Sequence, residues 1–496
     1  MTHRALAVDL GAGSGRVILG TLHEGRLTLE EVHRFPNEPV TVHGRLSWDI
    51  LALYREILKG LRVGAERAGV AALTVGIDTW GVDYGLIDAR GQLLQNPVCY
   101  RDSRTSGLIE ESLRLAGSGT LFRATGIPDL FFNTSLQLMA LARDEAELIP
   151  LVHRLLFTPD LLGYFLTGVA RAERTIAGTS QLLEAGARGQ WSEPTFKTLD
   201  LEDWLPKMAP LIEPGTVLGR ITDEVAATAG LPSGLTVVAV CSHDTESSLL
   251  AMPSHHEGAV FLNVGSWAIM GLEVDKPVLD ETFRLEGFSN EVGFGGKVCL
   301  LKNIMGLWLA QESKLTWERQ SGPLDWADLY REAAACPAFK VWVDPDDELF
   351  VAPGDLPARI RAYSQKTGQE NPTTRGAVLR CVLESLAFRF RQTWERLQAL
   401  SGRRLNRIHL MGGGSKGALL CQFTANACGQ TVEAGPEEAS ATGNLLAQFQ
   451  ATGALASIAE ARALVGHSFP TRVYQPQEDW TDAYQHFLTI IRSPDP

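Results

Sequence analysis

The fold of this chain is decided close to its N-terminus, by the stretch ALAVDLGAGSGRVILG at residues 5–20. Residues 5–10 form an apolar run interrupted by Asp9, a pattern typical of a buried strand that ends on a carboxylate. Small residues follow, then a second strand pattern at residues 17–22, and the turn Gly25-Arg26 leads to a third over 27–35. The stretch therefore predicts a three-stranded β-meander whose first turn is built from small residues.

The small-residue turn at 11–15 is suited to holding a phosphate. Without bulky side chains, successive backbone N–H groups can approach phosphate oxygens and form an anion nest. Asp9, at the end of the first strand, can hold Mg²⁺ through water. The turn lacks the Gly-Lys-Ser/Thr ending of a Walker A loop, and a strand rather than a helix follows it. A plain glycine-rich hairpin remains the alternative interpretation.

The rest of the first half combines strands and helices. Apolar spacing predicts a helix over residues 50–68 and strands over 73–78 and 84–87. Residues 106–230 are expected to be mostly helical, and the apolar run at 236–241 predicts another buried strand.

The second half repeats the opening pattern. Strands are expected at residues 259–264 and 268–273, joined by the turn Gly265-Ser266-Trp267. We interpret this strand, small-residue turn and strand as a diverged internal duplication with a boundary near residue 250. Further along, the pattern predicts a helix over 374–400, a strand over 407–411, a glycine turn at 412–415 and a helix through residue 427.

A carboxylate suited to proton transfer follows the strand at 236–241. Asp244 lies in the sequence Ser242-His243-Asp244-Thr245. At the end of a buried strand it can accept the proton of an attacking sugar hydroxyl, while His243 and Thr245 hydrogen-bond neighbouring hydroxyls. An Asp that caps a helix beginning near Thr245 is the structural alternative.

Two further segments suit ligand binding less specifically. Trp80 could lie against a sugar face, with Asp78 and Asp83 near polar groups, although a core Trp beside a turn is the commoner case. The turn Gly412-Gly413-Gly414-Ser415 would admit a flat ring or a phosphate, or it is only a tight strand-to-helix connection. The order of the motifs, rather than any single one, indicates function.

The composition disfavours several classes of partner. The 496 residues carry a formal net charge of −13, so nucleic acid and anionic membranes are not expected as partners. The seven cysteines are widely spaced and include no CxxC pair, which favours reduced thiols in the cytoplasm over disulfides or a zinc site. No apolar run reaches the roughly 20 residues of a membrane span, and no signal peptide is expected.

In this order the motifs resemble those of the FGGY carbohydrate kinases, which belong to the actin-like ATPase superfamily. The resemblance extends over about residues 5–455. The segments most similar to the branch of the family that phosphorylates L-rhamnulose are 8–12, 14–16, 76–83, 100–104, 243–245, 301–312, 412–415 and 434–439.

The resemblance implies an α/β fold of two ribonuclease-H-like (actin-like) domains with an interdomain cleft for ATP and sugar. The domains are expected at residues 1–248, on the sugar and phosphate side, and 249–496, on the nucleotide side. The implied reaction is ATP- and Mg²⁺-dependent phosphorylation of a ketose hydroxyl, with L-rhamnulose converted to L-rhamnulose 1-phosphate. A cytoplasmic monomer or homodimer is expected.

The same resemblance assigns roles to individual residues. Asp244 would be the general base. Sugar contacts would come from Gly81, His243, Asp244, Thr245 and Asn303. ATP contacts would come from Ala12, Gly13, Ser14, Gly15, Arg16, Ser266, Gln311 and Gly413, and Asp9 would serve Mg²⁺ through water.

This sequence departs from the family branch at a few positions. Gly13 stands where Ser is usual, Ser266 replaces a Thr, Ser415-Lys416-Gly417 replaces a segment that usually carries Gln-Asn, and Glu246 stands where a small residue is usual. The last three affect nucleotide contact and local charge, but no departure removes a group that the chemistry needs.

Two other functions remain open at this point. One is another FGGY ketose kinase, acting on L-fuculose, xylulose or ribulose. The other is a non-kinase actin-like ATPase, a chaperone or a filament subunit. That class should lack the His243-Asp244-Thr245 base segment and the Trp80-Gly81 segment.

Overall fold

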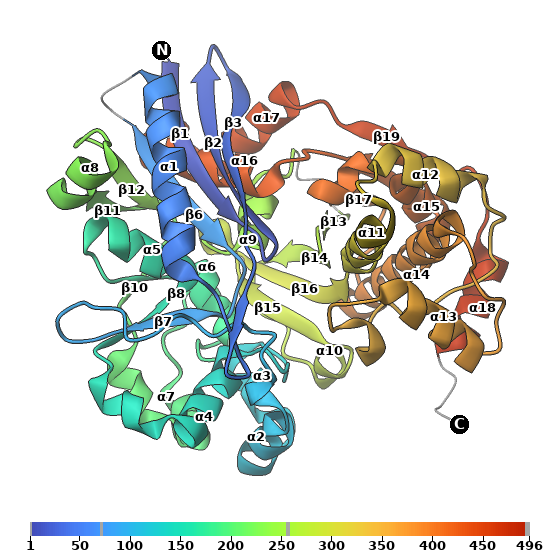
Figure 1. The fold of residues 1–496 in the computed structure, drawn as a ribbon, viewed down its shortest axis with the longest axis horizontal. Coiled ribbons are helices and arrows are strands. Elements are labelled where there is room, and N and C mark those ends of the chain that lie inside the picture. Colours follow the sequence, from blue (N-terminus) through green and yellow to red (C-terminus); the bar gives the residue numbers. More distant parts are fainter. Residues whose placement is uncertain (1, 70–72, 254–257, 492–496) are drawn as a thin grey trace. The chain divides into compact units, whose positions relative to one another are not determined.

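The computed structural model describes residues 2–69, 73–253 and 258–491 (Figure 1). By packing, the chain separates into two compact units. The first covers residues 1–254, 273–301 and 439–468, and the second covers 255–272, 302–438 and 469–496. Both units are therefore built from segments distant in sequence. The expected domains at 1–248 and 249–496 are continuous in sequence, unlike these units, and they stay a prediction.

The first unit is built on a six-stranded sheet in the order β11-β12-β6-β1-β2-β3. The strands are β1 (Thr2–Leu10), β2 (Ser14–His23), β3 (Arg26–Pro36), β6 (Thr74–Thr79), β11 (Thr216–Arg220) and β12 (Thr236–Ala239). β1, β2 and β3 form the predicted antiparallel meander, whereas β1, β6 and β12 run parallel. The carboxyl ends of β1, β6 and β12 consequently share one edge of the sheet.

Helix α1 (Ile50–Ala68) has the predicted bounds, and local signals explain both ends. The side chain of Asp49 accepts a hydrogen bond from the N–H of Ala52 at 3.0 Å. Gly69 ends the helix with φ of 61°, a left-handed conformation that glycine adopts without a steric penalty. Between the caps, apolar residues recur at helical spacing and are buried.

Two helices pack on opposite faces of this sheet. Gly64 of α1 faces Leu6, to which a Cβ would lie within 2.5 Å. Helix α16 (Ala439–Ala451) packs against Gly20 through Leu445. Because the register of β1 and β2 pairs Gly20 with Ala5, the α16 face carries small residues while Leu6 points toward α1. The small residues allow α16 to approach the sheet closely.

The region at 106–230 is mostly helical, as predicted. Its helices are α2 (Leu108–Ala116), α3 (Thr120–Thr125), α4 (Thr134–Asp144), α5 (Thr158–Thr167), α6 (Arg174–Ala177), α7 (Glu193–Thr198) and α8 (Asp223–Ala229). Short strands that the sequence did not predict also occur, with β8 (Arg154–Phe157) paired to β7 (Tyr84–Ile87) and β9 (Ala172–Glu173) paired to β10 (Leu211–Ile212). Segments this short show no readable alternation.

The second unit contains strands in the order β14-β13-β17-β18-β19. They are β13 (Ala259–Val264), β14 (Trp267–Val274), β17 (Arg407–Met411), β18 (Thr431–Ala434) and β19 (Arg472–Tyr474). β13 pairs with β14 antiparallel and with β17 parallel, β17 pairs with β18 parallel, and β18 pairs with β19 antiparallel. The order and directions repeat those of β2-β1-β6-β12-β11, which supports the predicted internal duplication.

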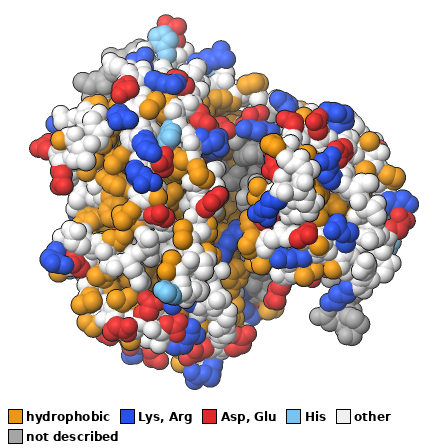
Figure 2. Space-filling view, in the orientation of Figure 1, with side chains coloured by type: hydrophobic (Ala, Val, Ile, Leu, Met, Phe, Trp, Pro, Cys, Tyr) orange, Lys and Arg blue, Asp and Glu red, His pale blue; other side chains and the backbone are white. Residues whose placement is uncertain are grey.

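The second unit is rich in helices. They are α11 (Trp308–Ser321), α12 (Trp326–Ala335), α13 (Leu356–Lys366), α14 (Arg375–Ser401), α15 (Ala418–Cys428) and α18 (Thr481–Ile491). The long helix predicted at 374–400 corresponds to α14, whose cap is Thr374. Within the described residues, no helix has both the length and the apolar character needed to cross a bilayer. On the face drawn in Figure 2, acidic and basic side chains are interspersed.

We predict that Gly443→Ala destabilises the protein while Gly163→Ala does not. Both glycines lie inside helices, where alanine is favoured by about 1 kcal/mol. A Cβ on Gly443 would overlap the carbonyl oxygen of Ser247, whereas a Cβ on Gly163 would meet only Leu218 at 3.4 Å. Overpacking should therefore lower the free energy of unfolding of Gly443→Ala by about 1–3 kcal/mol. Urea denaturation of both variants tests this, and equal stability would contradict it.

Candidate active site

Three carboxylates meet at the edge of the first sheet where β1, β6 and β12 end. The register of β1 and β6 places Asp9 opposite Asp78. An isolated parallel bridge joins Thr79, the last residue of β6, to His243, which directly precedes Asp244. Parallel strands end at the same edge, so three segments far apart in the sequence deliver these side chains to one place.

Asp9 is buried, and one of its carboxylate oxygens lies among positive and polar groups. Its Oδ2 accepts hydrogen bonds from Arg16 Nε at 3.0 Å and Arg16 Nη2 at 2.7 Å. Ser440 of α16 donates its hydroxyl to the same oxygen at 2.5 Å. Arg16, assigned to ATP from the resemblance, thus lies beside the carboxylate assigned to Mg²⁺.

Asp78 is fully buried, and α16 supplies its partner. Asn444 Nδ2 donates to Asp78 Oδ2 at 2.6 Å, and Gln448 in turn donates to Asn444 Oδ1 at 2.7 Å. Burial, followed by the nearby charge of Asp9, raises the pKa of Asp78 well above its usual range. The site therefore disfavours the ionised form of Asp78 relative to water.

Asp244 begins helix α9 (Asp244–Leu250), one residue earlier than the sequence suggested. The carboxylate does not serve as the N-cap side chain, because the N-cap residue is His243. Thr245 Oγ1 donates to Asp244 Oδ1 at 3.2 Å. About a third of the Asp244 side chain (30%) stays exposed, which leaves it within reach of a ligand.

Opposing effects set the protonation of this pair. The net pKa of Asp244 is raised to about 6. Burial raises this pKa most, His243 lowers it, and the charge of Asp9 raises it. Burial disfavours the charged form of His243, but Glu291 and Asp244 outweigh that effect and raise its pKa to about 9. At neutral pH the pair is therefore an ionised Asp244 beside a protonated His243, with His243 Nε2 3.6 Å from Asp244 Oδ1.

Glu173 holds the turn that carries this pair, and no sequence signal pointed to it. Its carboxylate accepts hydrogen bonds from the N–H of Ser242 at 3.1 Å and from the N–H of Thr175 at 2.8 Å. Thr175 Oγ1 accepts from the N–H of His243 at 3.2 Å. Only the folded chain brings Glu173 to a turn about 70 residues away, as long-range contacts do.

Trp80 does not lie open to a sugar face, as one interpretation of the sequence suggested. Its side chain is buried and its ring centroid lies 4.4 Å from that of Trp48. Both indole N–H groups donate to Asp83 Oδ2, Trp48 at 2.6 Å and Trp80 at 2.9 Å. The alternative of a core Trp beside a turn is correct. Gly81, the adjacent predicted sugar contact, packs against Thr179.

The predicted nucleotide residues of the second unit form their own group. Ser266 Oγ donates to Gln311 Oε1 at 2.7 Å. The hydroxyl group of Ser266, which stands where a Thr is expected, therefore already has a hydrogen-bond partner. Gly413 lies next to Val264, but a Cβ on it would meet no atom nearer than 4.0 Å. By contrast, a Cβ on Gly414 would lie 2.5 Å from Val264 Cβ.

Asn303 and the N-terminal turn complete the predicted set. Asn303 lies in β16 (Val298–Met305), within the second unit, and is half-buried. In the first unit Gly13 faces open space, and the N–H of Gly11 donates to the carbonyl of Ser14 at 2.9 Å, which closes the turn. The predicted residues are thus divided between the two units.

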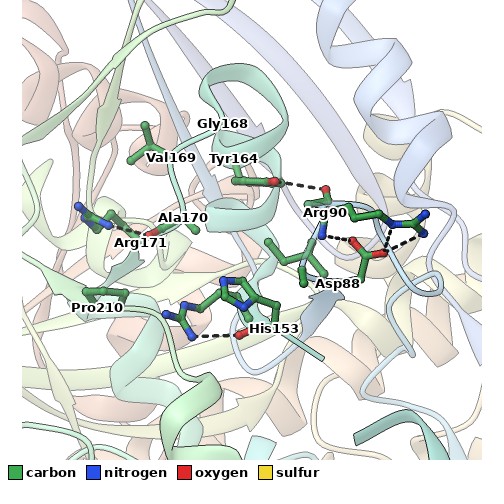
Figure 3. Close-up of a pocket in the computed structure, with 13 residues that line it drawn as sticks. Asp88, Arg90, His153, Tyr164, Gly168, Val169, Ala170, Arg171 and Pro210 are labelled. Atoms are coloured by element: carbon green, nitrogen blue, oxygen red, sulfur yellow. Dashed lines mark hydrogen bonds and ion pairs between the residues drawn. The ribbon is translucent and has the colours of Figure 1, made fainter. Parts of the chain in front are cut away.

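A pocket elsewhere in the first unit contains none of these residues (Figure 3). Asp88, Arg90 and Tyr164 contribute to its wall. Asp88 Oδ2 accepts from Arg90 Nε at 3.1 Å, and the Tyr164 hydroxyl donates to the carbonyl of Gly91 at 3.2 Å. Since these polar groups pair with one another, the carboxylate edge is the better candidate site.

The sequence matches both domains of one protein family. The N-terminal domain of the FGGY family of carbohydrate kinases matches residues 4–251, and its C-terminal domain matches residues 260–452. A rhamnulokinase of Bacteroides thetaiotaomicron is 41% identical over 99% of this chain and 100% of its own length. One from Bacillus subtilis is 34% identical over 98% of both chains.

Solved structures share the fold at lower identity. A xylulose kinase from Lactobacillus acidophilus superposes with a TM-score of 0.78 at 15% identity, covering 98% of this chain and 96% of that chain. A glycerol kinase from Plasmodium falciparum, solved with ADP, gives 0.76 at 14% identity over 99% and 97%. The expected two-domain actin-like fold is thereby confirmed.

We predict that Asp83→Asn destabilises the fold, because Asp83 joins two buried indoles. An amide in place of the carboxylate would turn one N–H₂ group toward a buried donor, either an indole or the amide of Gln137, which donates to Asp83 Oδ1 at 3.1 Å. The free energy of unfolding should fall by about 1–3 kcal/mol. Asp203→Asn, at an exposed position, is the matched control and should leave the melting temperature unchanged.

Proposed function

Because the chain belongs to the FGGY family of carbohydrate kinases, we propose that it transfers the γ-phosphoryl group of ATP to L-rhamnulose, forming L-rhamnulose 1-phosphate. Family membership makes it a phosphotransferase that acts on a sugar hydroxyl and uses ATP. The choice of sugar rests on relatives named rhamnulokinase that align over nearly the whole chain at 34–41% identity. The observation that carries the chemistry is an ionised, partly open Asp244 beside a protonated His243.

Asp244 acts as the general base in this proposal. Its carboxylate accepts the proton of the sugar 1-hydroxyl as that oxygen attacks the γ-phosphorus, and the bond to the β,γ-bridging oxygen breaks. A pKa of about 6 keeps the carboxylate ionised at neutral pH while leaving it basic enough to take the proton. His243, with Gly81, Thr245 and Asn303, positions the sugar hydroxyls.

ATP is the phosphoryl donor, and we propose that Mg²⁺ accompanies it. The carboxylates at the sheet edge fit such a hard cation, since they are oxygen donors and Asp78 Oδ1 has no hydrogen-bond partner among the described residues. Asp9 would hold the ion through water, and the ion would neutralise phosphate charge. The amides of residues 12–16 would bind phosphate oxygens, and Ser266, Gln311 and Gly413 would contact the nucleotide.

We further propose a cytoplasmic enzyme, monomeric or homodimeric, whose domains cover residues 1–248 and 249–496. All seven cysteines are free thiols in the structure, which fits a reducing compartment. The net charge of −13 supports small-molecule partners rather than nucleic acid or an anionic membrane.

Asp244→Asn tests the general base. The amide has nearly the same shape, so the fold and ligand binding should persist, while kcat falls on the order of 10²–10⁴-fold. In the unsubstituted enzyme, kcat/KM should fall as the pH drops through about 6, because Asp244 becomes protonated there. The variant should lack this pH dependence, and Asp203→Asn should keep it. Near-normal turnover by Asp244→Asn would reject the assignment.

Gly413→Val tests the nucleotide contact. Since no protein atom lies within 4.0 Å of a Cβ at this position, the variant should fold normally but crowd a bound nucleotide. The KM for ATP should rise several-fold more than the KM for the sugar. Gly414→Ala is the structural control, because its Cβ meets Val264 and should lower stability instead. A selective rise in the sugar KM of Gly413→Val would reverse the assignment.

A panel of free sugars decides the substrate. Specificity constants measured with ATP and L-rhamnulose, L-fuculose, xylulose, ribulose and glycerol should be highest for L-rhamnulose. A site built to hydrogen-bond a hydroxyl rejects an analogue lacking it by roughly 10⁴–10⁵-fold, so glycerol should be inert. If another ketose exceeds L-rhamnulose, the kinase assignment stands and the sugar is wrong. ATP turnover that is independent of sugar would favour a non-kinase ATPase.

A further inference from the structure

A second group of buried side chains lies on the side of the His243 ring that faces away from Asp244. Strand β15 (Phe288–Val292) brings Glu291 to His243, with Glu291 Oε2 3.0 Å from His243 Nδ1. Cys299 of β16 donates its thiol to Glu246 Oε2 of α9 at 2.9 Å. His243, Glu246, Glu291 and Cys299 all belong to the first unit, and we call them the His243 cluster.

Polar atoms of this cluster converge, and one of them has no partner. One potential ligand atom each from His243, Glu246 and Glu291 can be chosen so that all lie within 4.8 Å of one another. The three residues are only 7%, 1% and 6% exposed. His243 Nδ1 lies 3.0 Å from Glu291 Oε2 and forms an ion pair with it when protonated, whereas Glu246 Oε1 has no hydrogen-bond partner among the described residues. A buried polar atom left unpaired in this way is costly and points to a bound species.

Gly293 keeps room beside the cluster. A Cβ at this position would lie 3.0 Å from Cys299 Sγ and 3.3 Å from Glu246 Oε2. The φ of Gly293 is −97°, a conformation that any residue adopts, so the backbone itself does not require glycine here. The missing side chain instead leaves space at the thiol and the carboxylate.

The cluster brings two carboxyl groups to one imidazole without a Lys or Arg. Glu246 and Glu291 are both acidic, and within the described part of the chain neither forms an ion pair with a Lys or Arg. The pKa of Glu246 is raised to about 8, chiefly by burial, so its carboxyl group gives up a proton when it binds an ion.

We propose that the His243 cluster binds one transition-metal ion of the zinc class, separate from the Mg²⁺ that accompanies ATP. Imidazole nitrogen, carboxylate oxygen and thiolate sulfur are the ligands that zinc prefers, whereas Mg²⁺ takes oxygen ligands. Binding releases three protons to solvent, from the Cys299 thiol, the Glu246 carboxyl and His243 Nδ1, and the charge of the ion then takes the place of the imidazolium charge beside Asp244. The ligand atom of His243 is Nδ1, so Nε2 keeps its proton and still faces Asp244 at 3.6 Å. Glu246, the residue that departs from the family pattern, supplies one ligand.

Co²⁺ substitution tests the site without ATP or sugar. The full-length chain is treated with chelator, returned to metal-free buffer and titrated with Co²⁺. We expect one Co²⁺ per chain, with visible bands of tetrahedral intensity and a near-ultraviolet thiolate charge-transfer band. Zn²⁺ should displace the ion and excess Mg²⁺ should not. Absence of a saturable Co²⁺ spectrum would overturn the proposal.

Three variants locate the ion. Cys299→Ser should remove the charge-transfer band, and Glu246→Gln should weaken Co²⁺ affinity at least about 10–100-fold. Cys336→Ser, a half-buried thiol outside the cluster, is the control and should bind like the unsubstituted chain. Circular dichroism verifies that each variant is folded, and if Cys299→Ser does not fold, Glu246→Gln decides alone. Unchanged binding by the folded cluster variants would place the ion elsewhere and reject the site.

Discussion

Crowding of carboxylates at one edge of a parallel sheet is the constraint on which the first unit depends. Asp9 and Asp78 end neighbouring strands, and Asp244 follows the next parallel strand. Repulsion between such buried charges would oppose folding unless other groups compensate. Arg16 neutralises Asp9, while Ser440 and Asn444 donate hydrogen bonds to the two strand-end carboxyls. Helix α16 therefore both packs on the sheet and supplies hydrogen-bond donors to its buried carboxyl groups.

Helix α16 must lie close to the sheet to donate these hydrogen bonds. Short side chains such as Ser440 and Asn444 reach the carboxyl groups only if the helix lies near the sheet. Gly20 and Gly76 on the sheet provide that proximity, since a Cβ on either would contact α16 side chains at 2.5 Å. The close packing of α16 at this edge is thus what allows its side chains to stabilise the buried carboxyl groups.

The same crowding sets the chemistry. Burial and the charge of Asp9 raise the pKa of Asp244, and the cationic His243 holds it near 6 rather than higher. His243 is in turn influenced from its other side by Glu291. One imidazole therefore connects the proposed base to the buried His243 cluster. Its two ring nitrogens allow it to serve both without competition.

Apolar periodicity, caps and turn residues act over a few neighbouring positions. The sequence by itself therefore predicted the strands that open each half of the chain, the helices α1 and α14, and the two small-residue hairpins. The residues assigned to sugar and ATP came from the resemblance to the FGGY kinases, through motifs that are contiguous in the chain, and they stay a prediction.

Only the tertiary structure decided which distant groups meet. It brought Ser440 to Asp9 across 431 positions, placed Glu173 under the His243 turn, and buried Trp80 against Trp48 instead of leaving it open. It also assigned residues 439–468 to the first unit. Such contacts depend on how whole elements pack, and a helix or strand pattern specifies which face is apolar without specifying which segment covers it.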